Sequence, residues 1–385
     1  MNPRRWMAVA CLTGLCLGWA RGAAAQSVRA PYLQLGTPDS VRVVWRTAAA
    51  EDSVVCWGDT PDSLVARATG ASEVTDHEVA ITGLEPETRY HYAVSSNGAC
   101  PPPAAGDPED YFRTAPPVGG TAPFTMWVVG DSGTGSVRQR GVFEAMLAEV
   151  GDDAPDLFLH VGDMAYGSGT TSEFDENFFD MYAPLLRHTV TWAAMGNHEG
   201  RSSTSSTESG PYYDAYVLPS ASEAGGLASG TEAYYAFDYG NVHFVVLDSH
   251  QSSRDVDGPM LTWLSDDLAS TDADWIIAFW HHPPYTKGSH DSDTEGALID
   301  MRENAMPILE AAGVDVVLTG HSHIYERSHL IHGAYDTPTT ASGHIVDPGD
   351  GRPDGDGAYA ARGDGTVQVV AGHGGTGVGG DATTR

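Results

Sequence analysis

Basic residues are scarce in this sequence, and lysine is almost missing. The 385 residues include 52 aspartates and glutamates but only 20 lysines and arginines, a formal net charge of −32 at pH 7, and Lys287 is the single lysine. Such a charge repels phosphate backbones and anionic lipid headgroups, which argues against binding of nucleic acids or membrane surfaces. The arginine and aspartate bias is typical of a surface that stays hydrated in high salt, and equally of a GC-rich genome.

Long hydrophobic runs are missing as well. The longest uncharged, mostly apolar stretch, Trp6 to Ala20, has 15 residues, whereas a membrane-spanning helix needs about 20. Two arginines precede the stretch, and three alanines before Gln26 satisfy the small-residue rule for signal-peptide cleavage. We therefore expect residues 1–25 to be a signal peptide and the mature protein to be secreted or periplasmic, without an anchor.

Cysteine is limited to four residues. Cys11 and Cys16 fall within the expected signal peptide, which leaves Cys56 and Cys100 in an oxidising compartment where a disulfide is permitted. Because Cys56 lies in a predicted strand and Cys100 in a predicted loop, the sequence leaves their pairing open.

Residues 26–115 are predicted to form an all-β domain. Short runs of alternating apolar and polar residues, bounded by turn residues, are typical of strands. The clearest runs are 40–47, 53–57 and 88–94. The absence of a helical stretch predicts a β-sandwich, and residues 83–92 resemble the turn and strand of fibronectin type III domains. A proline- and glycine-rich linker, 116–122, follows.

Residues 123–385 are predicted to form an α/β domain with layered sheets. Six apolar runs, several of them separated by helix-compatible segments, each end in a polar cluster. The runs are 124–129, 157–161, 189–195, 242–247, 275–280 and 314–319. Because ligands bind beyond the carboxyl ends of strands in open α/β sheets, we expect these clusters to meet at one rim.

Eight oxygen and nitrogen donors follow these runs. They are Asp131, Asp163, Tyr166, Asn197, His198, His281, His321 and His323. Each alone has an ordinary structural explanation, but carboxylates and imidazoles without a thiolate suit iron, zinc or manganese. Eight donors exceed the needs of one ion and a carboxylate can bridge two, so the set predicts a two-metal hydrolytic site.

The order and spacing of these donors resemble those of calcineurin-like metallophosphoesterases. The matching motifs are Asp-x-Gly at Asp131, Gly-Asp-x-x-Tyr at Asp163, Gly-Asn-His-Glu at Asn197, a strand-end histidine at His281 and Gly-His-x-His at His321. The Asp-x-Gly form and Tyr166 are further similar to the purple acid phosphatases. The resemblance covers about residues 28–375 and implies a β-sandwich core flanked by helices, preceded by a fibronectin-like domain.

The resemblance implies two metal sites that share Asp163. The first, usually Fe(III), would be held by Asp131, Asp163, Tyr166 and His323, and the second, for iron, zinc or manganese, by Asp163, Asn197, His281 and His321. A phenolate on Fe(III) gives the family its colour. His281 is expected to be the ligand, rather than His282, because the ligating histidine of the family directly follows the apolar strand.

The resemblance also implies an acid phosphatase that hydrolyses small phosphomonoesters. In the mechanism that it implies, the metals would bind a phosphate oxygen and lower the pKa of a bound water, which would attack as hydroxide in line with the leaving alcohol. His198 is expected to bind the phosphate or protonate the leaving oxygen, beside Asn197. His290 resembles a second family histidine at the substrate mouth, and an exposed loop histidine is the alternative explanation for it.

Two other functions stay open. One is a phosphodiesterase or nucleotidase on the same metal site, and the other is a cell-surface binding protein whose fibronectin-like domain is the working part and whose metal site is vestigial. The stretch 367–372 resembles a late strand of the family, and the chain stops in glycines soon afterward, where relatives commonly continue. The oligomeric state, the physiological substrate and the pH optimum are left open by the sequence.

Overall fold

The computed structural model describes most of the chain. The described residues are 27–95, 99–100, 106–108, 110–151, 153–337, 343–352, 354–359 and 364–378. The expected signal peptide, residues 1–25, lies outside them. Within these ranges, no helix has the length and apolar character needed to cross a membrane.

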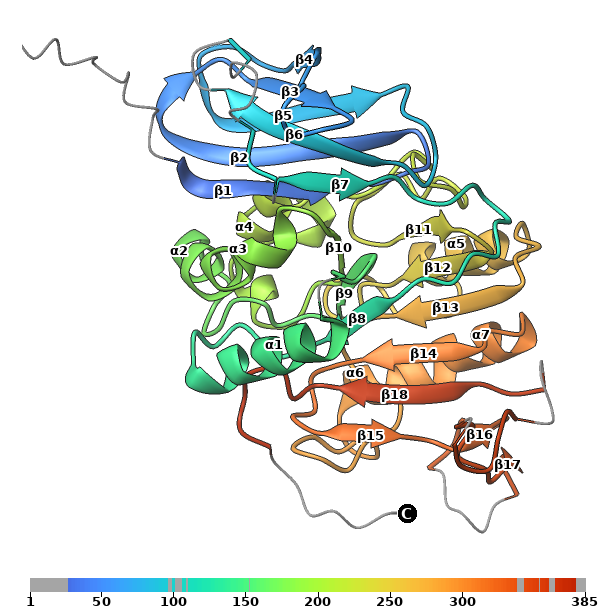
Figure 1. Cartoon of the computed structure of the whole chain (residues 1–385). Helices are drawn as coiled ribbons and strands as arrows, with labels where there is room; N and C mark the ends of the chain where they lie inside the picture. The colour runs from blue at the N-terminus through green and yellow to red at the C-terminus, as the bar shows by residue number, and fades with distance from the viewer. Residues whose placement is uncertain are drawn as a thin grey trace, which may run out of the picture.

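Two antiparallel sheets form the N-terminal domain, drawn in blue and cyan at the top of Figure 1. The first sheet has the order β1–β2–β5 and the second β4–β3–β6–β7. Their bounds are β1 Ser27–Gln34, β2 Ser40–Glu51, β3 Val54–Gly58, β4 Ala66–Thr69, β5 Val74–Thr82, β6 Arg89–Ser95 and β7 Tyr111–Arg113. Burial alternates residue by residue from Ser40 to Thr47, as in a strand with one face in the core. The predicted all-β sandwich is confirmed.

A disulfide bond joins the two mature-chain cysteines. Cys56 in β3 and Cys100, beyond the end of β6, are bonded, with their Cα atoms 5.7 Å apart. The bond ties the segment that follows β6 to the middle of β3, so the pairing that the sequence leaves open is present in the structure.

The second domain is built on two sheets. A three-stranded sheet has the order β10–β9–β8, and a six-stranded sheet has the order β11–β12–β13–β14–β18–β15. Their bounds are β8 Met126–Val129, β9 Leu157–His160, β10 Val190–Ala193, β11 Tyr235–Tyr239, β12 Val242–Val246, β13 Trp275–Phe279, β14 Val316–Thr319, β15 Tyr325–Arg327 and β18 Val367–Ala371, with a separate hairpin of β16 Leu330–Ile331 and β17 Ile345–Asp347. The strands of the smaller sheet, and β12, β13, β14 and β18, run parallel, so their carboxyl ends point the same way within each sheet.

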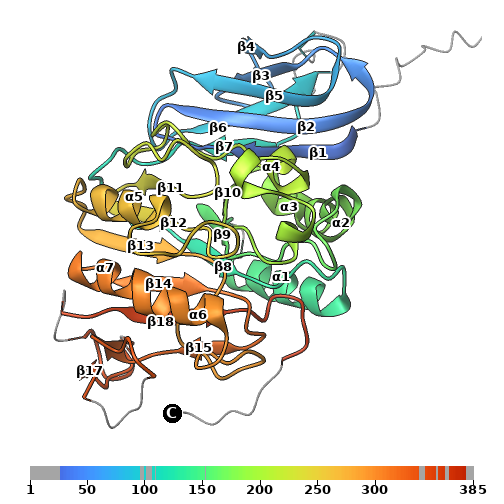
Figure 2. The same ribbon diagram turned by 180° about the vertical axis from the view of Figure 1, so that it is seen from behind.

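Helices flank both sheets (Figures 1 and 2). Their bounds are α1 Val137–Val150, α2 Thr171–Phe174, α3 Asp180–Leu186, α4 Pro211–Ala215, α5 Pro259–Leu268, α6 Gly296–Asp300 and α7 Met306–Ala311, with short 3-10 or π segments η1 Asp175–Phe179, η2 Glu199–Arg201, η3 Ser205–Thr207 and η4 Met301–Ala305. Trp192 of β10 stacks on Phe237 of β11 at a centroid distance of 3.8 Å, which joins the two sheets. Residues of α5 and α7 cover the other face of β13 and β14, where Ala278 and Val317 lie.

The N-terminal domain packs directly on the second domain. The Tyr32 hydroxyl donates to the Ala215 carbonyl (2.8 Å), and the Tyr92 hydroxyl donates to the Arg187 carbonyl (2.7 Å). Arg29, only 4% exposed, pairs with Asp175 at 2.6 Å. A single hydrophobic cluster therefore runs from β1 and β2 into the second domain.

Candidate metal centre

The polar clusters predicted at the strand ends meet at one rim of the second domain. Asp131 follows β8, Asp163 follows β9 and His281 follows β13. Each of these buried side chains places a potential ligand atom within 4.8 Å of those of the other two. Asp131 and Asp163 have φ values of 55° and 59°, and this sparsely populated conformation turns the chain sharply at the strand end.

Tyr166 and His323 lie on the Asp131 side of this centre. The Tyr166 hydroxyl donates to Asp131 Oδ1 at 3.0 Å and lies 3.3 Å from His323 Nε2. His323 Nε2 is in turn 3.5 Å from Asp131 Oδ1. A phenol, a carboxylate and an imidazole thus converge on one point, and they are three of the residues expected around the first metal.

Asn197, His281 and His321 converge on the opposite side. Asn197 Oδ1 lies 3.1 Å from His281 Nε2 and 2.9 Å from His321 Nδ1. His281 Nδ1 lies 2.9 Å from the Val161 carbonyl, which can only accept, so this nitrogen carries the hydrogen and Nε2 faces the centre. These are three of the residues expected around the second metal.

Asp163 lies between the two groups. Its carboxylate interacts with Tyr166 on one side, and its Oδ2 is 3.5 Å from His281 Nε2 on the other. The backbone N–H of His198 donates to its Oδ1 at 2.9 Å. Asp163 thus contacts both groups, as expected of a carboxylate that bridges two ions.

The carboxylates of Asp131 and Asp163 are buried side by side, so a positive charge between them is stabilising. Burial raises the pKa of Asp131, and the neighbouring Asp163 adds to the rise. Burial opposes the charge of His281, but the carboxylates of Asp163 and Asp131 outweigh it and raise the pKa of His281 to about 9. Burial and the nearby His281 lower the pKa of His321 to about 2, so its neutral ring keeps a lone pair for a cation. The donor set and its field fit bound metal ions.

His198 lies at the rim of the centre. Its Nδ1 is 2.8 Å from the Gly167 carbonyl and therefore donates to it, which leaves Nε2 facing Asp163 Oδ2 at 3.8 Å. Its ring lies 4.2 Å from the Tyr166 ring, centroid to centroid.

His290 also reaches the centre, although it belongs to the segment between β13 and α6. Its ring stacks on His321 with the centroids 3.7 Å apart, and its Nδ1 lies 2.9 Å from Glu295 Oε2. His282 bonds to Ser249 Oγ instead (2.9 Å), and burial lowers its pKa far below the usual range. The structure thus brings His281, and not its neighbour, to Asp163.

Glu199 is a site residue for which the sequence predicts no role of its own. Its carboxylate is fully buried and accepts hydrogen bonds from the backbone N–H groups of Asp163 (2.8 Å), Ala165 (3.0 Å) and Gly196 (2.9 Å). Burial and the charge of Asp163 raise its pKa to about 7. Glu199 joins the loops that follow β9 and β10, and its place in the Gly-Asn-His-Glu motif is the one signal for it in the sequence.

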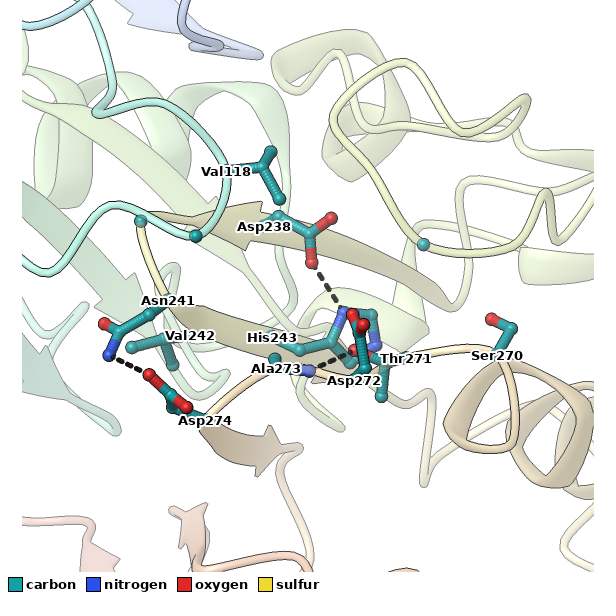
Figure 3. Close-up of a pocket in the computed structure, with 13 residues that line it drawn as sticks. Val118, Asp238, Asn241, Val242, His243, Ser270, Thr271, Asp272, Ala273 and Asp274 are labelled. Carbon is teal, nitrogen blue, oxygen red and sulfur yellow. Dashed lines mark hydrogen bonds and ion pairs between the residues drawn. The ribbon is translucent and has the colours of Figure 1, made fainter.

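A cavity of about 440 Å³ lies away from this centre, at the amino-terminal ends of β12 and β13 (Figure 3). Asp238, Asp272 and Asp274 line it, and none of the predicted site residues does. At its wall His243 lies between two carboxylates, with Nδ1 2.7 Å from Asp238 and Nε2 2.8 Å from Asp267. We interpret this arrangement as a stabilising buried charge cluster.

The sequence of the chain matches two family models. Residues 124–325 match the calcineurin-like phosphoesterase model, and residues 28–114 match the N-terminal domain of purple acid phosphatases. The chain belongs to the calcineurin-like phosphoesterase family. The predicted resemblance to its purple acid phosphatase branch is thereby confirmed.

Relatives of this calcineurin-like phosphoesterase include purple acid phosphatases 23 and 22 of Arabidopsis thaliana. The first is 31% identical over 285 residues, which cover 66% of this chain and 58% of the relative. The second is 30% identical over 314 residues, which cover 77% of this chain and 66% of the relative. The chain thus spans only part of the length of these relatives.

Two solved structures share the fold. The purple acid phosphatase PPD1 from yellow lupin (Lupinus luteus) seeds superposes with a TM-score of 0.64 at 19% identity, over 92% of this chain and 66% of that chain. The structure of PhoD superposes with a TM-score of 0.60 at 16% identity, over 90% of this chain and 77% of that chain. The predicted fold class, an all-β domain followed by an α/β metallophosphoesterase domain, is confirmed.

Proposed function

We propose that this protein is an exported acid phosphatase that hydrolyses small phosphomonoesters at a site for two metal ions. The observation that carries the proposal is the convergence of Asp131, Asp163 and His281 within 4.8 Å. Oxygen and nitrogen donors flank these three residues on both sides. Two buried carboxylates among imidazoles form a donor set suited to iron, zinc or manganese.

We assign three residues to each ion and one residue to both. Asp131, Tyr166 and His323 would hold the first ion, Asn197, His281 and His321 the second, and Asp163 both. Fe(III) would suit the first position because its ligands would include a phenolate oxygen and two carboxylates, and iron, zinc or manganese would suit the second. Bound there, the ions would polarise the phosphate and activate the attacking water.

His198 is placed for proton transfer and phosphate binding. Because its Nδ1 donates to the Gly167 carbonyl, Nε2 is the nitrogen that faces the centre. From there it would hydrogen-bond a phosphate oxygen or give a proton to the leaving oxygen. We propose Asn197 and His290 as the other substrate-binding residues, since Asn197 precedes His198 and His290 covers His321.

Paired initial rates test the proposal. The purified mature protein, with iron, zinc or manganese supplied in high salt, is given a chromogenic phosphomonoester and the matching diester. We expect a monoester preference that is lost in Asp163→Asn and kept in Asp272→Asn, whose side chain is exposed at the distant cavity. A diester preference would instead favour a phosphodiesterase or nucleotidase, and no turnover of either ester would favour a binding protein.

A further inference from the structure

Lys287, the single lysine, lies near the centre but is already neutralised. Its Nζ pairs with Asp291 and, at 2.7 Å, with Asp293. The backbone N–H of Lys287 also donates to Glu326. Two carboxylates on one ammonium leave no net positive charge at Lys287 for an anionic group of the substrate that lies outside the proposed metal site.

Arg201 is a second cation at the rim, and it is not neutralised. It ends η2, two residues after Glu199 of the Gly-Asn-His-Glu motif. Its side chain is exposed, and no carboxylate pairs with it in the described part of the chain. Its Nη1 donates to the Gly167 carbonyl at 2.7 Å, so one of the five N–H groups of the guanidinium is anchored.

The anchor fixes the guanidinium beside His198. The Gly167 oxygen that accepts from Arg201 also accepts from His198 Nδ1 at 2.8 Å. Gly167 directly follows Tyr166, whose hydroxyl lies at the centre. The Arg201 guanidinium is already held by the Gly167 carbonyl next to His198. Little side-chain freedom is therefore lost when an anion binds, so the charge is preorganised.

We propose that Arg201 is a specificity-determining residue that binds a second anionic group, a phosphate or a carboxylate, on the leaving group of the substrate. The inference rests on the proposed function, since His198 marks where the transferred phosphate lies. A guanidinium matches both anions with two parallel hydrogen bonds. In a chain with a net charge of −32, a substrate with two anionic groups gains most from an unneutralised cation at the mouth.

Three substrates test the inference on the metal-loaded protein. They are a chromogenic monoester without a second anion, a nucleoside diphosphate, and phosphoenolpyruvate, which carries a carboxylate. In Arg201→Gln we expect the ratio of kcat/KM for a second-anion substrate to that for the chromogenic ester to fall about tenfold or more, the range of hydrogen bonds to charged groups. Arg201→Lys should restore part of the ratio, because it keeps the charge without the planar pair of donors.

Arg140, exposed on α1, provides the matched control, and Arg140→Gln should leave the ratio unchanged. A fall only with the diphosphate identifies the second anion as a phosphate, and a fall only with phosphoenolpyruvate identifies it as a carboxylate. An equal loss on all three substrates, or no loss on either second-anion substrate, would overturn the role of Arg201. Wild-type protein that turns over none of the three substrates would instead overturn the proposed function itself.

Discussion

Glu199 shows at the scale of one residue how the centre is held in shape. Its carboxylate receives three backbone N–H groups from the loops that present Asp163 and Asn197. Removing an acceptor from buried donors costs about 1–3 kcal/mol for each donor. The geometry of the proposed metal ligands therefore depends on Glu199, which we do not assign to either ion.

Replacing Glu199 with alanine should cost both stability and metal. We expect the free energy of unfolding to fall by about 3 kcal/mol or more, because three buried N–H groups lose their acceptor. The metal content of the purified protein should also fall. Glu199→Gln, which keeps one carbonyl oxygen, should have a stability and a metal content between those of wild type and Glu199→Ala. Urea unfolding and metal analysis measure the effects, and an alanine variant with wild-type stability and full metal content would refute this role.

His243, which lies far from the centre, makes the free energy of unfolding depend on pH. Burial opposes its charge, but the hydrogen bonds that the ring donates to Asp238 and Asp267 outweigh it and raise its pKa to about 9. Because this folded-state pKa exceeds the ordinary value of about 6.5, the contribution is fully present below pH 6.5 and is lost as pH rises through about 9. The shift corresponds to about 3 kcal/mol.

His243→Asn should remove this pH dependence. The variant cannot carry a proton, so it should be less stable than wild type at pH 6 by about 3 kcal/mol, and the two should approach each other at pH 10. Urea unfolding at pH 6, 8 and 10 measures the difference. Parallel stability curves for the two proteins over this range would contradict the assignment.

The donors of the centre could be predicted from the sequence, but the contacts among them could not. Asp131, Asp163 and His281 each follow an apolar run, and the motif spacing carries that information. The stacking of His290 on His321 and the anchoring of His198 by the Gly167 carbonyl join residues far apart in the chain. Such contacts depend on how loops from different strands cross, which local patterns do not encode.

At the scale of secondary structure elements, the six predicted apolar runs all contain strands, β8, β9, β10, β12, β13 and β14. The late strand expected at 367–372 is β18, which lies between β14 and β15. Its place could not be predicted, because the order of strands in a sheet is set by packing and not by the sequence of one strand. The short strand β15 has no buried apolar run to mark it.

The disulfide between β3 and the segment after β6 should contribute to stability and not to catalysis. The bonded cysteines are 44 residues apart, and closing a loop of this size is worth about 2–4 kcal/mol. We expect Cys56→Ala/Cys100→Ala to lower the free energy of unfolding by that amount and to leave kcat/KM unchanged, since the bond lies in the N-terminal domain. Unchanged stability, or a loss of kcat/KM at a temperature where the variant is folded, would contradict this.

For the whole molecule, the acidic charge is spread over two domains that share a hydrophobic cluster. Repulsion among excess carboxylates destabilises the compact state, and it is screened when the Debye length falls from about 10 Å at 0.1 M salt to about 3 Å at 1 M. We expect the midpoint of thermal unfolding to rise over this range of NaCl. An equal concentration of an uncharged osmolyte is the control, and a midpoint that falls or stays level with NaCl would argue against repulsion.

We propose that two metal ions bind between Asp131, Asp163 and the surrounding imidazoles and perform the hydrolysis. Metal content and phosphomonoester turnover, measured on the same preparations of wild type, Asp163→Asn and Asp272→Asn, test it most directly. We expect two ions per chain and turnover in wild type and Asp272→Asn. Asp163→Asn should hold at most one ion and lose turnover. Wild type that takes up no metal, or Asp163→Asn that keeps two ions and full turnover, would contradict the claim.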